Sequence, residues 1–270
     1  MRTKSRLTIT LPKDLLNKVD KTIDGSEIRN RSHAIESLIR KSLKTPLETA
    51  IILTGGDKHK NNPTLKTIGN QSLLRHTISQ LVSNGISQVV ICAGKDIEEI
   101  KKDLKKSEEN IRIRFISETS PSGTGGAVKK AEKYITGENF LIIHGDILTN
   151  MNLKTFIQFH SQEDTLATIA VKPRKGEKSF GKVLIEGNQI TDFFEKTETK
   201  GIDIINTGIY VFKSQILKRI VKKSKLESDI FPTLAGEGEL TAFIFQGFWQ
   251  DISNQKDYKT AQTNWAKTNQ

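Results

Sequence analysis

The sequence predicts an α/β protein in which a doubly wound, mostly parallel sheet is preceded by a small module of one strand and two helices. Two patterns indicate this arrangement. Polar and apolar residues alternate strictly before two helical periodicities within residues 1–45, and buried strands alternate with helices from residue 50 onward. We therefore expect a linker over residues 46–49 and an α/β domain over residues 50–270. A hydrophobic content of 35% with 27% charged residues suits two cored units.

The first predicted element is a strand over residues 6–11. A period of two separates its apolar side chains from its polar ones. The apolar face consists of Leu7, Ile9 and Leu11, and the polar face consists of Arg6, Thr8 and Thr10. One face of this strand is thus suited to a core and the other to a polar partner.

Two helices are predicted next. Pro12 suits the entry to the first helix, and Gly25 is expected to close it. The apolar positions of this helix are Leu15, Leu16, Val19 and Ile23. The second helix begins with Ser32 as its N-cap and stops before Pro46. Its apolar stripe consists of Ala34, Ile35, Leu38, Ile39 and Leu43.

A unit of this size with one strand cannot bury enough surface alone, and its strand has two open edges. We expect a homodimer, or a higher even oligomer, in which two copies pair their strands antiparallel. The outward ribbon of Arg6, Thr8 and Thr10 would then fit a DNA major groove. The start of the second helix at Ser32 would bind phosphate, with Arg29 and Arg31 adding charge.

Charge is distributed in keeping with a DNA partner. Residues 1–45 hold eleven lysines and arginines against five acidic residues, so they carry +6 of the net charge of +11. With its strand and its Arg-Ser at the second helix, this segment resembles the ribbon-helix-helix repressors over roughly residues 5–44. The resemblance implies that the strand reads bases. An alternative is a dimerisation arm that has lost its DNA function.

From residue 50 the predicted elements alternate. Strands are expected at 50–53, 88–93, 112–116 and 140–143, and helices at 72–84, 97–104 and 126–135. Such alternation predicts a parallel sheet with its ligand site at the carboxyl ends of the strands. The single cysteine, Cys92, falls within a strand, which favours a buried position over a nucleophile and excludes an intramolecular disulfide.

Two strand ends carry residues suited to phosphate chemistry. Gly55 and Gly56 follow the first strand, where paired glycines let backbone approach a phosphate and Lys58 and Lys60 supply positive charge. Asp146 follows the strand at 140–143, where a carboxylate binds a hard cation beside phosphates. Asp251 offers a second carboxylate much later in the chain.

Together, these loops and several further motifs resemble the sugar-1-phosphate nucleotidyltransferases over roughly residues 48–262. The further motifs are the glycine-rich segment 121–127, Ile68-Gly69-Asn70, Phe180-Gly181, Phe194-Glu195-Lys196, Asn206-Thr207-Gly208 and the segment 226–232. The resemblance implies attack of a sugar 1-phosphate on the α-phosphorus of a nucleoside triphosphate, with release of pyrophosphate. Positioning and charge neutralisation dominate such chemistry.

The resemblance also implies roles for individual residues. Gly55, Gly56 and Lys58 would hold the nucleotide, and Gly123 with Thr124 would lie against its base. Asp146 and Asp251 would bind Mg²⁺, with Asp146 also counted as catalytic. The sugar-phosphate positions are Gly181, Glu195, Lys196 and Asn206.

The family's glycine-rich loop normally carries an arginine and a lysine that hold the triphosphate, and both are missing here. Lys60 occupies the arginine's place by forward count, Pro63 the lysine's by backward count, and Lys66 is a further substitute cation. Two functions stay open: a nucleotidyltransferase that binds DNA, and a transcriptional regulator whose degenerate enzyme domain senses a nucleotide sugar or sugar phosphate. Because no apolar run reaches membrane-spanning length, we expect a cytoplasmic protein without a membrane partner.

Overall fold

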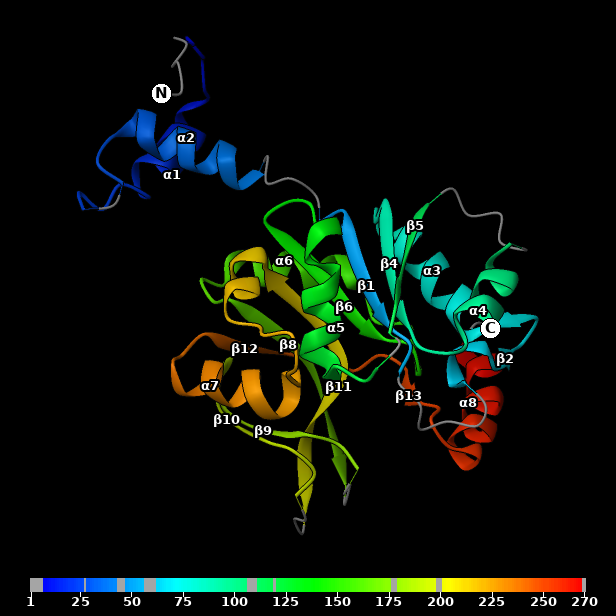
Figure 1. Cartoon of the computed structure of the whole chain (residues 1–270). Helices are drawn as coiled ribbons and strands as arrows, with labels where there is room; N and C mark the ends of the chain where they lie inside the picture. The colour runs from blue at the N-terminus through cyan, green and yellow to red at the C-terminus, as the bar shows by residue number, and fades with distance from the viewer. Residues whose placement is uncertain are drawn as a thin grey trace. The chain divides into compact units, whose positions relative to one another are not determined.

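The computed structural model describes residues 7–26, 28–42, 47–55, 62–105, 111–118, 120–175, 179–197 and 201–268. The chain divides into two compact units, Met1–Pro46 and Leu47–Gln270, each of which has its own fold (Figure 1). Within the described residues, no helix combines the length and the apolar character needed to cross a membrane.

The N-terminal unit contains two helices, α1 (Lys13–Asp20) and α2 (Arg31–Ser42), as predicted. The two helices are in contact, and Val19 on α1 and Ala34 on α2 are buried. The predicted N-cap is wrong by two residues: the side chain of Asn30, rather than of Ser32, accepts a hydrogen bond from the backbone N–H of His33 at 2.9 Å. Asn30 immediately precedes the helix, and its side chain satisfies one of the free N–H groups of the first turn. Ser32 therefore lies inside that turn and does not cap it.

The predicted strand is not formed in this single chain. Residues 7–12 have no regular secondary structure, and Arg6 lies outside the described residues. A strand needs a hydrogen-bonded neighbour, and the described part of this unit supplies none. Several large apolar side chains of the unit are exposed: Leu7, Ile9, Leu15, Leu38 and Ile39.

The larger unit is built on a nine-stranded sheet in the order β5-β4-β1-β6-β11-β8-β12-β10-β9. Its first four strands are parallel: β5 (Arg112–Ser117), β4 (Gln88–Ala93), β1 (Thr49–Leu53) and β6 (Asn139–His144). These four agree with the predicted strands to within one or two residues. Cys92 is fully buried in β4, and burial raises the pKa of its thiol well above the usual range.

The second half of the sheet is mixed. Its strands are β8 (Ala167–Lys175), β9 (Lys182–Glu186), β10 (Gln189–Phe194), β11 (Ile202–Lys213) and β12 (Leu240–Ile244). Strands β10 and β11 run against the other seven. Seven of the nine strands therefore run in one direction, as predicted for a mostly parallel sheet. Because β10 and β11 each lie between strands of the other direction, half of the eight neighbouring pairs are nevertheless antiparallel.

Helices cover both faces of this sheet. The side chains of β1 alternate between the two cores that lie under these helices. Ile51 and Leu53 face the core beneath α5 (Gly123–Ala131) and α7 (Phe231–Gly236). Ala50 and Ile52 face the core beneath α3 (Leu73–Ser83), α4 (Ile97–Leu104) and α6 (Leu153–Gln162). The predicted helices at 72–84 and 97–104 are confirmed, and the one predicted at 126–135 begins at Gly123.

Short elements complete the unit. The hairpin strands β2 (Thr67–Ile68) and β3 (Gln71–Ser72) precede α3, and β7 (Ile147–Thr149) pairs antiparallel with β13 (Trp249–Asp251). The C-terminal helix α8 (Gln255–Thr268) lies beside β2 (Figure 1). Three 3₁₀ turns and one π-helical turn connect the rest: η1 (Pro63–Leu65), η2 (Glu132–Tyr134), η3 (Ser214–Lys218) and η4 (Leu226–Ile230).

Candidate active site

A cavity of about 280 Å³ lies where β6 and β13 end and against the middle of β11. It brings together residues from positions 124 to 251, which are widely separated in the sequence. Seven of the predicted site residues line it: Thr124, Asp146, Gly181, Glu195, Lys196, Asn206 and Asp251. The carboxyl edge of the sheet is therefore the candidate active site, as the alternation of strands and helices predicts.

Two carboxylates share one end of this cavity. Asp146 immediately precedes β7, and Asp251 ends β13, where it pairs with Ile147 of β7. The backbone N–H of Ile252 also donates to the carbonyl of Asp146 at 2.9 Å. Burial and the negative charge of Asp146 raise the pKa of Asp251 from 3.8 to about 6. The two groups are thus held together at an electrostatic cost, which a bound cation would relieve.

Gly145 explains how Asp146 reaches this position. A Cβ at Gly145 would lie 2.7 Å from the Thr64 hydroxyl oxygen and 3.1 Å from the Cα of Thr54. Its N–H donates to the carbonyl of Leu53 at 2.8 Å, which joins the end of β6 to the end of β1. A glycine is needed here because the chain passes directly against the start of the glycine-rich loop.

Glu195 and Lys196 directly follow β10 and also line the cavity. Lys196 adopts a φ of +54°, the one left-handed residue other than glycine among the described residues. Its ammonium group lies 3.5 Å from a carboxylate oxygen of Glu195. Burial is the largest influence on Glu195 and raises the pKa of its carboxyl group. A left-handed backbone beside a carboxylate with a raised pKa is typical of a ligand site.

Asn206 lies at an irregularity in β11, where the register against β8 shifts between Asn206 and Tyr210. Its side-chain oxygen accepts from the N–H of Gly208 at 3.0 Å, and its amide donates to the Tyr210 hydroxyl at 2.9 Å. Its own N–H donates to the carbonyl of Gly181. These bonds fix two predicted sugar-phosphate positions relative to each other.

Glu227, which carries no predicted role, also lines the cavity. One of its carboxylate oxygens accepts from the Thr124 hydroxyl at 2.6 Å, and that hydroxyl oxygen accepts from the N–H of Leu226 at 2.8 Å. The other oxygen is buried without a hydrogen-bond partner and lies 3.6 Å from His144 Nε2. The sequence marks Glu227 only as part of the motif at 226–232, because its contacts with Thr124 and His144 span about a hundred residues of chain.

Lys66 does not line the cavity, but it lies close to its carboxylate end. Its Nζ donates to the carbonyl of Ile252 at 3.1 Å and stands 5.1 Å from the centre of the Tyr258 ring. Burial lowers the pKa of this ammonium group, and the negative charge of Asp251 opposes that shift. The structure therefore places the ammonium group of Lys66 within electrostatic range of Asp251.

The other predicted nucleotide residues are only partly described. Gly56, Lys58 and Lys60 lie outside the described residues, and the exposed Gly55 has a φ of +87°. Gly123 does not line the cavity. A Cβ at that position would stand 2.2 Å from the carbonyl oxygen of Ser224, so this glycine allows the start of α5 to contact the backbone of the 222–226 segment.

The residues predicted to contact DNA belong to the N-terminal unit. Thr8, Thr10, Arg29 and Ser32 are exposed. Arg31 instead forms two hydrogen bonds with the carboxylate of Asp20, at 2.6 and 2.8 Å. Its charge therefore has an internal partner that links α1 to the start of α2.

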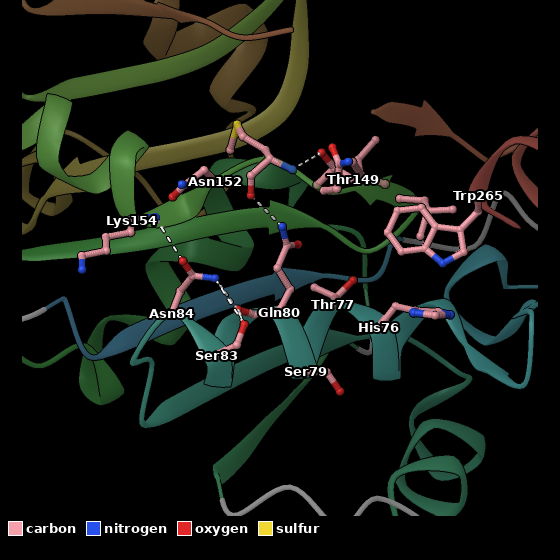
Figure 2. Close-up of a pocket in the computed structure, with 14 residues that line it drawn as sticks. His76, Thr77, Ser79, Gln80, Ser83, Asn84, Thr149, Asn152, Lys154 and Trp265 are labelled. Carbon is pink, nitrogen blue, oxygen red and sulfur yellow. Dashed lines mark hydrogen bonds between the residues drawn. The ribbon is translucent and has the colours of Figure 1, made fainter. Parts of the chain in front are cut away.

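A second, larger cavity of about 690 Å³ lies against α3, β7 and the start of α6 (Figure 2). It contains no carboxylate, and several of its polar side chains are engaged with the protein itself. Gln80 donates to the carbonyl of Met151 at 2.8 Å, and Asn84 accepts from the N–H of Lys154 at 3.1 Å. We assign the chemistry to the smaller cavity, because it concentrates charged side chains and is lined by His144 and Glu227, which each carry a buried polar atom without a hydrogen-bond partner.

The carboxylate pair suits a hard cation in an incomplete cage. Among the described residues, no three His, Cys, Asp or Glu side chains gather to hold a metal by themselves. Mg²⁺ is commonly held by one or two carboxylates together with substrate phosphates. The donors present fit that mode, and they do not fit a closed structural metal site.

Residues 50–268 match the family model described as nucleotidyl transferase. The mannose-1-phosphate guanylyltransferase catalytic subunit beta of Drosophila pseudoobscura pseudoobscura is 33% identical over 224 residues, which are 78% of this chain and 60% of that protein. The mannose-1-phosphate guanyltransferase of Aspergillus fumigatus is 30% identical, with coverage of 78% and 62%. The chain therefore spans about 60% of the length of these relatives.

A solved structure resembles the same region. HddC from Yersinia pseudotuberculosis, complexed with GMP-PN, superimposes with a TM-score of 0.71 and 26% sequence identity. The match covers 81% of this chain and 100% of that one.

Proposed function

The chain belongs to the nucleotidyl transferase family, and we propose that it joins a nucleoside monophosphate group to a sugar 1-phosphate. In this reaction, a phosphate oxygen of the sugar 1-phosphate forms a bond to the α-phosphorus of a nucleoside triphosphate. The bond from that phosphorus to the oxygen bridging to the β-phosphate breaks, and pyrophosphate leaves with the electron pair. The products are a nucleotide sugar and pyrophosphate.

The gathering of seven predicted site residues in one 280 Å³ cavity is the observation that carries this proposal. The carboxylates of Asp146 and Asp251 line this cavity together with Glu195, Lys196 and Asn206. We propose that the ammonium group of Lys196 and backbone N–H groups near it bind the phosphate group of the sugar 1-phosphate. The unpartnered oxygen of Glu227 is suited to accept a hydrogen bond from a sugar hydroxyl.

We assign Asp146 and Asp251 as the ligands of a divalent cation, with Mg²⁺ as the candidate. When bound, such a cation supplies positive charge to the phosphates at the reacting centre. The protein's own part is to hold both substrates in line and to exclude water from the cavity.

Lys66 is the described cation best suited to replace the missing family arginine and lysine. Its ammonium group is beside the carboxylate pair, and both of its close contacts are uncharged. It is therefore available to stabilise the negative charge that moves onto the leaving pyrophosphate. The phosphate contacts predicted for Gly55, Gly56, Lys58 and Lys60, and the base contact predicted for Gly123, stay predictions.

The names of similar proteins suggest which substrates to test first. Two relatives are named for guanylyl transfer to mannose 1-phosphate, and HddC was solved with GMP-PN. We therefore select GTP and mannose 1-phosphate as the first probes and extend the panel to the other nucleoside triphosphates and hexose 1-phosphates. Mg²⁺-dependent release of pyrophosphate that requires both substrates would support the proposal. Silence with every pair would contradict it.

A second candidate is a regulator that binds DNA through the N-terminal unit and senses a nucleotide sugar in the cavity. The exposed apolar side chains of the N-terminal unit favour it, because residues 7–12 need a partner strand and a second copy would supply one. In that dimer, Arg6, Thr8 and Thr10 would face the DNA, with Arg29 and Ser32 at the phosphate backbone.

Titration of the full chain onto a fluorescent pool of random 30-base-pair duplexes tests this candidate. We expect binding that weakens steeply with salt, as phosphate contacts require. Adding GDP-mannose distinguishes the two functions. A change in DNA affinity favours the sensor, and an unchanged affinity leaves DNA binding as an anchor for the enzyme.

A further inference from the structure

We propose that Tyr258 is a positioning residue that holds Lys66 beside the carboxylate pair. This inference rests on the proposed function, in which Lys66 neutralises charge on the reacting phosphates. It gives α8 a role in the proposed reaction, although none of its side chains lines the 280 Å³ candidate active site.

Tyr258 makes two contacts with neighbouring residues of one short segment. Its ring faces the ammonium group of Lys66, with 5.1 Å between Nζ and the ring centre. Its hydroxyl donates to the carbonyl of Thr67, the next residue, at 2.7 Å, and accepts from the side-chain amide of Gln262 at 3.0 Å. The ring thus fixes the cation while the hydroxyl fixes the backbone from which that cation extends.

The backbone of Tyr258 belongs to the same short stretch of chain as Asp251. The N–H of Ser253 donates to the Asp251 carboxylate at 2.7 Å, and the N–H of Tyr258 donates to the carbonyl of Asn254 at 3.1 Å. The carbonyl of Ile252 accepts the Lys66 ammonium group directly. A single short stretch of chain, from Asp251 to Tyr258, therefore carries a proposed metal ligand and both contacts of the cation.

Helix α8 is itself firmly anchored. Ala261 is fully buried, and Trp265 packs edge-to-face against His76 at 5.5 Å and against Phe248 at 5.4 Å. Trp265 makes this packing without touching Lys66 in any described contact. It therefore serves as a matched control, since its loss weakens the helix without removing a partner of the cation.

The test uses the full chain with three substitutions: Tyr258→Leu, Tyr258→Phe and Trp265→Leu. The first readout is the rate of reductive methylation of Lys66, followed by mass spectrometry, with the exposed Lys259 as internal reference. The second is pyrophosphate release from GTP and mannose 1-phosphate with Mg²⁺. The labelling readout does not depend on turnover.

We expect Tyr258→Leu to label Lys66 about fivefold faster and to lower kcat about tenfold, with the KM for GTP nearly unchanged. Tyr258→Phe keeps the ring, so it should stay within about threefold of the wild type in both readouts. Trp265→Leu should lower the melting temperature without selective labelling of Lys66.

Two results would overturn the inference: unchanged labelling of Lys66 in Tyr258→Leu, or equal effects of Trp265→Leu and Tyr258→Leu in both readouts. An inactive wild type would defeat the proposed function instead. In that case, the labelling ratio alone would decide whether Tyr258 positions Lys66.

Discussion

Asp251 is the residue whose environment departs most from that of an ordinary surface carboxylate. It shares the cavity with Asp146, and burial together with the negative charge of Asp146 raises its pKa to about 6. Without a cation, this arrangement opposes folding, because the folded protein holds the Asp251 proton more tightly than the unfolded chain does. The site is therefore built for a positively charged ligand at a cost to the ligand-free protein.

That cost can be measured in Asp251→Asn. An acid with a raised folded pKa favours folding at low pH, and this advantage is lost as the pH rises through about 6. In the presence of EDTA, we expect the variant to be more stable than the wild type at pH 8, by about 1 to 3 kcal/mol, and nearly equal at pH 4. Urea unfolding at both pH values measures the difference. An equal difference at both would show that the charge is not the cause.

Lys66 provides the corresponding prediction for the reaction. Replacing it with methionine removes the cation while keeping most of the aliphatic chain. We expect kcat to fall about a hundredfold, as when one charge-stabilising donor is removed from an active site. The control is Lys154→Met, an exposed lysine beside the larger cavity. Equal activities of the two variants in pyrophosphate release would refute the assigned role.

At the scale of elements, α5 shows how the glycine-rich segment serves packing. Cβ atoms at Gly125 and Gly126 would stand 2.4 Å from the Ser224 hydroxyl and 2.5 Å from the Lys222 carbonyl oxygen. The N–H of Gly126 donates to the carbonyl of Ser224 at 3.1 Å. These glycines let the helix approach the 222–226 segment, and that approach brings Thr124 within reach of Glu227.

Substitution of Gly126 tests this packing. Gly126→Ala places a methyl group against backbone that cannot move aside easily, so we expect a loss of about 1 to 3 kcal/mol of stability. Gly236 in α7 is the matched control, because a Cβ there meets nothing within 4 Å. Gly236→Ala should be neutral or slightly stabilising, by up to about 1 kcal/mol. Thermal melts of both variants would contradict the argument if the two alanines behaved alike.

Elements in the first half of the larger unit are predictable from local patterns. Strand β4 and helix α4 have the expected bounds because buried runs and helical stripes are signals within a few residues. The antiparallel pairings of β11 with β6 and with β8 join segments that are far apart in the sequence and are not readable in this way. The same reason explains the site: Asp146 and Asp251 end recognisable motifs, whereas Glu227 gains meaning only from Thr124 and His144.

At the scale of the molecule, the chain joins two units with different surface character. Among its described residues the N-terminal unit, which spans Met1–Pro46, exposes five large apolar side chains, including Leu38 on α2, and those of the much longer Leu47–Gln270 unit also expose five. Its predicted strand lacks hydrogen-bonding partners among the described residues of one chain. A second copy satisfies both requirements, so we expect the intact protein to be a dimer held by this unit.

Substitution of Leu38 by glutamate should dissociate that dimer. Burial of a charge in an apolar interface is costly, so the variant should elute as a monomer in light-scattering chromatography while keeping the larger unit folded. Val221→Glu is the control, because Val221 is also exposed but belongs to the other unit. A dimer that survives Leu38→Glu and dissociates with Val221→Glu would place the interface elsewhere.

Catalysis by the cavity is the central claim, and ³¹P NMR of one reaction mixture tests it most directly. The intact protein is incubated with GTP, mannose 1-phosphate and Mg²⁺, with Asp146→Asn as the comparison. We predict loss of both substrate signals with equal growth of pyrophosphate and of a new sugar-linked diphosphate, and no change with the variant. Formation of GDP and inorganic phosphate instead, or product formation that is unaffected by Asp146→Asn, would contradict the account.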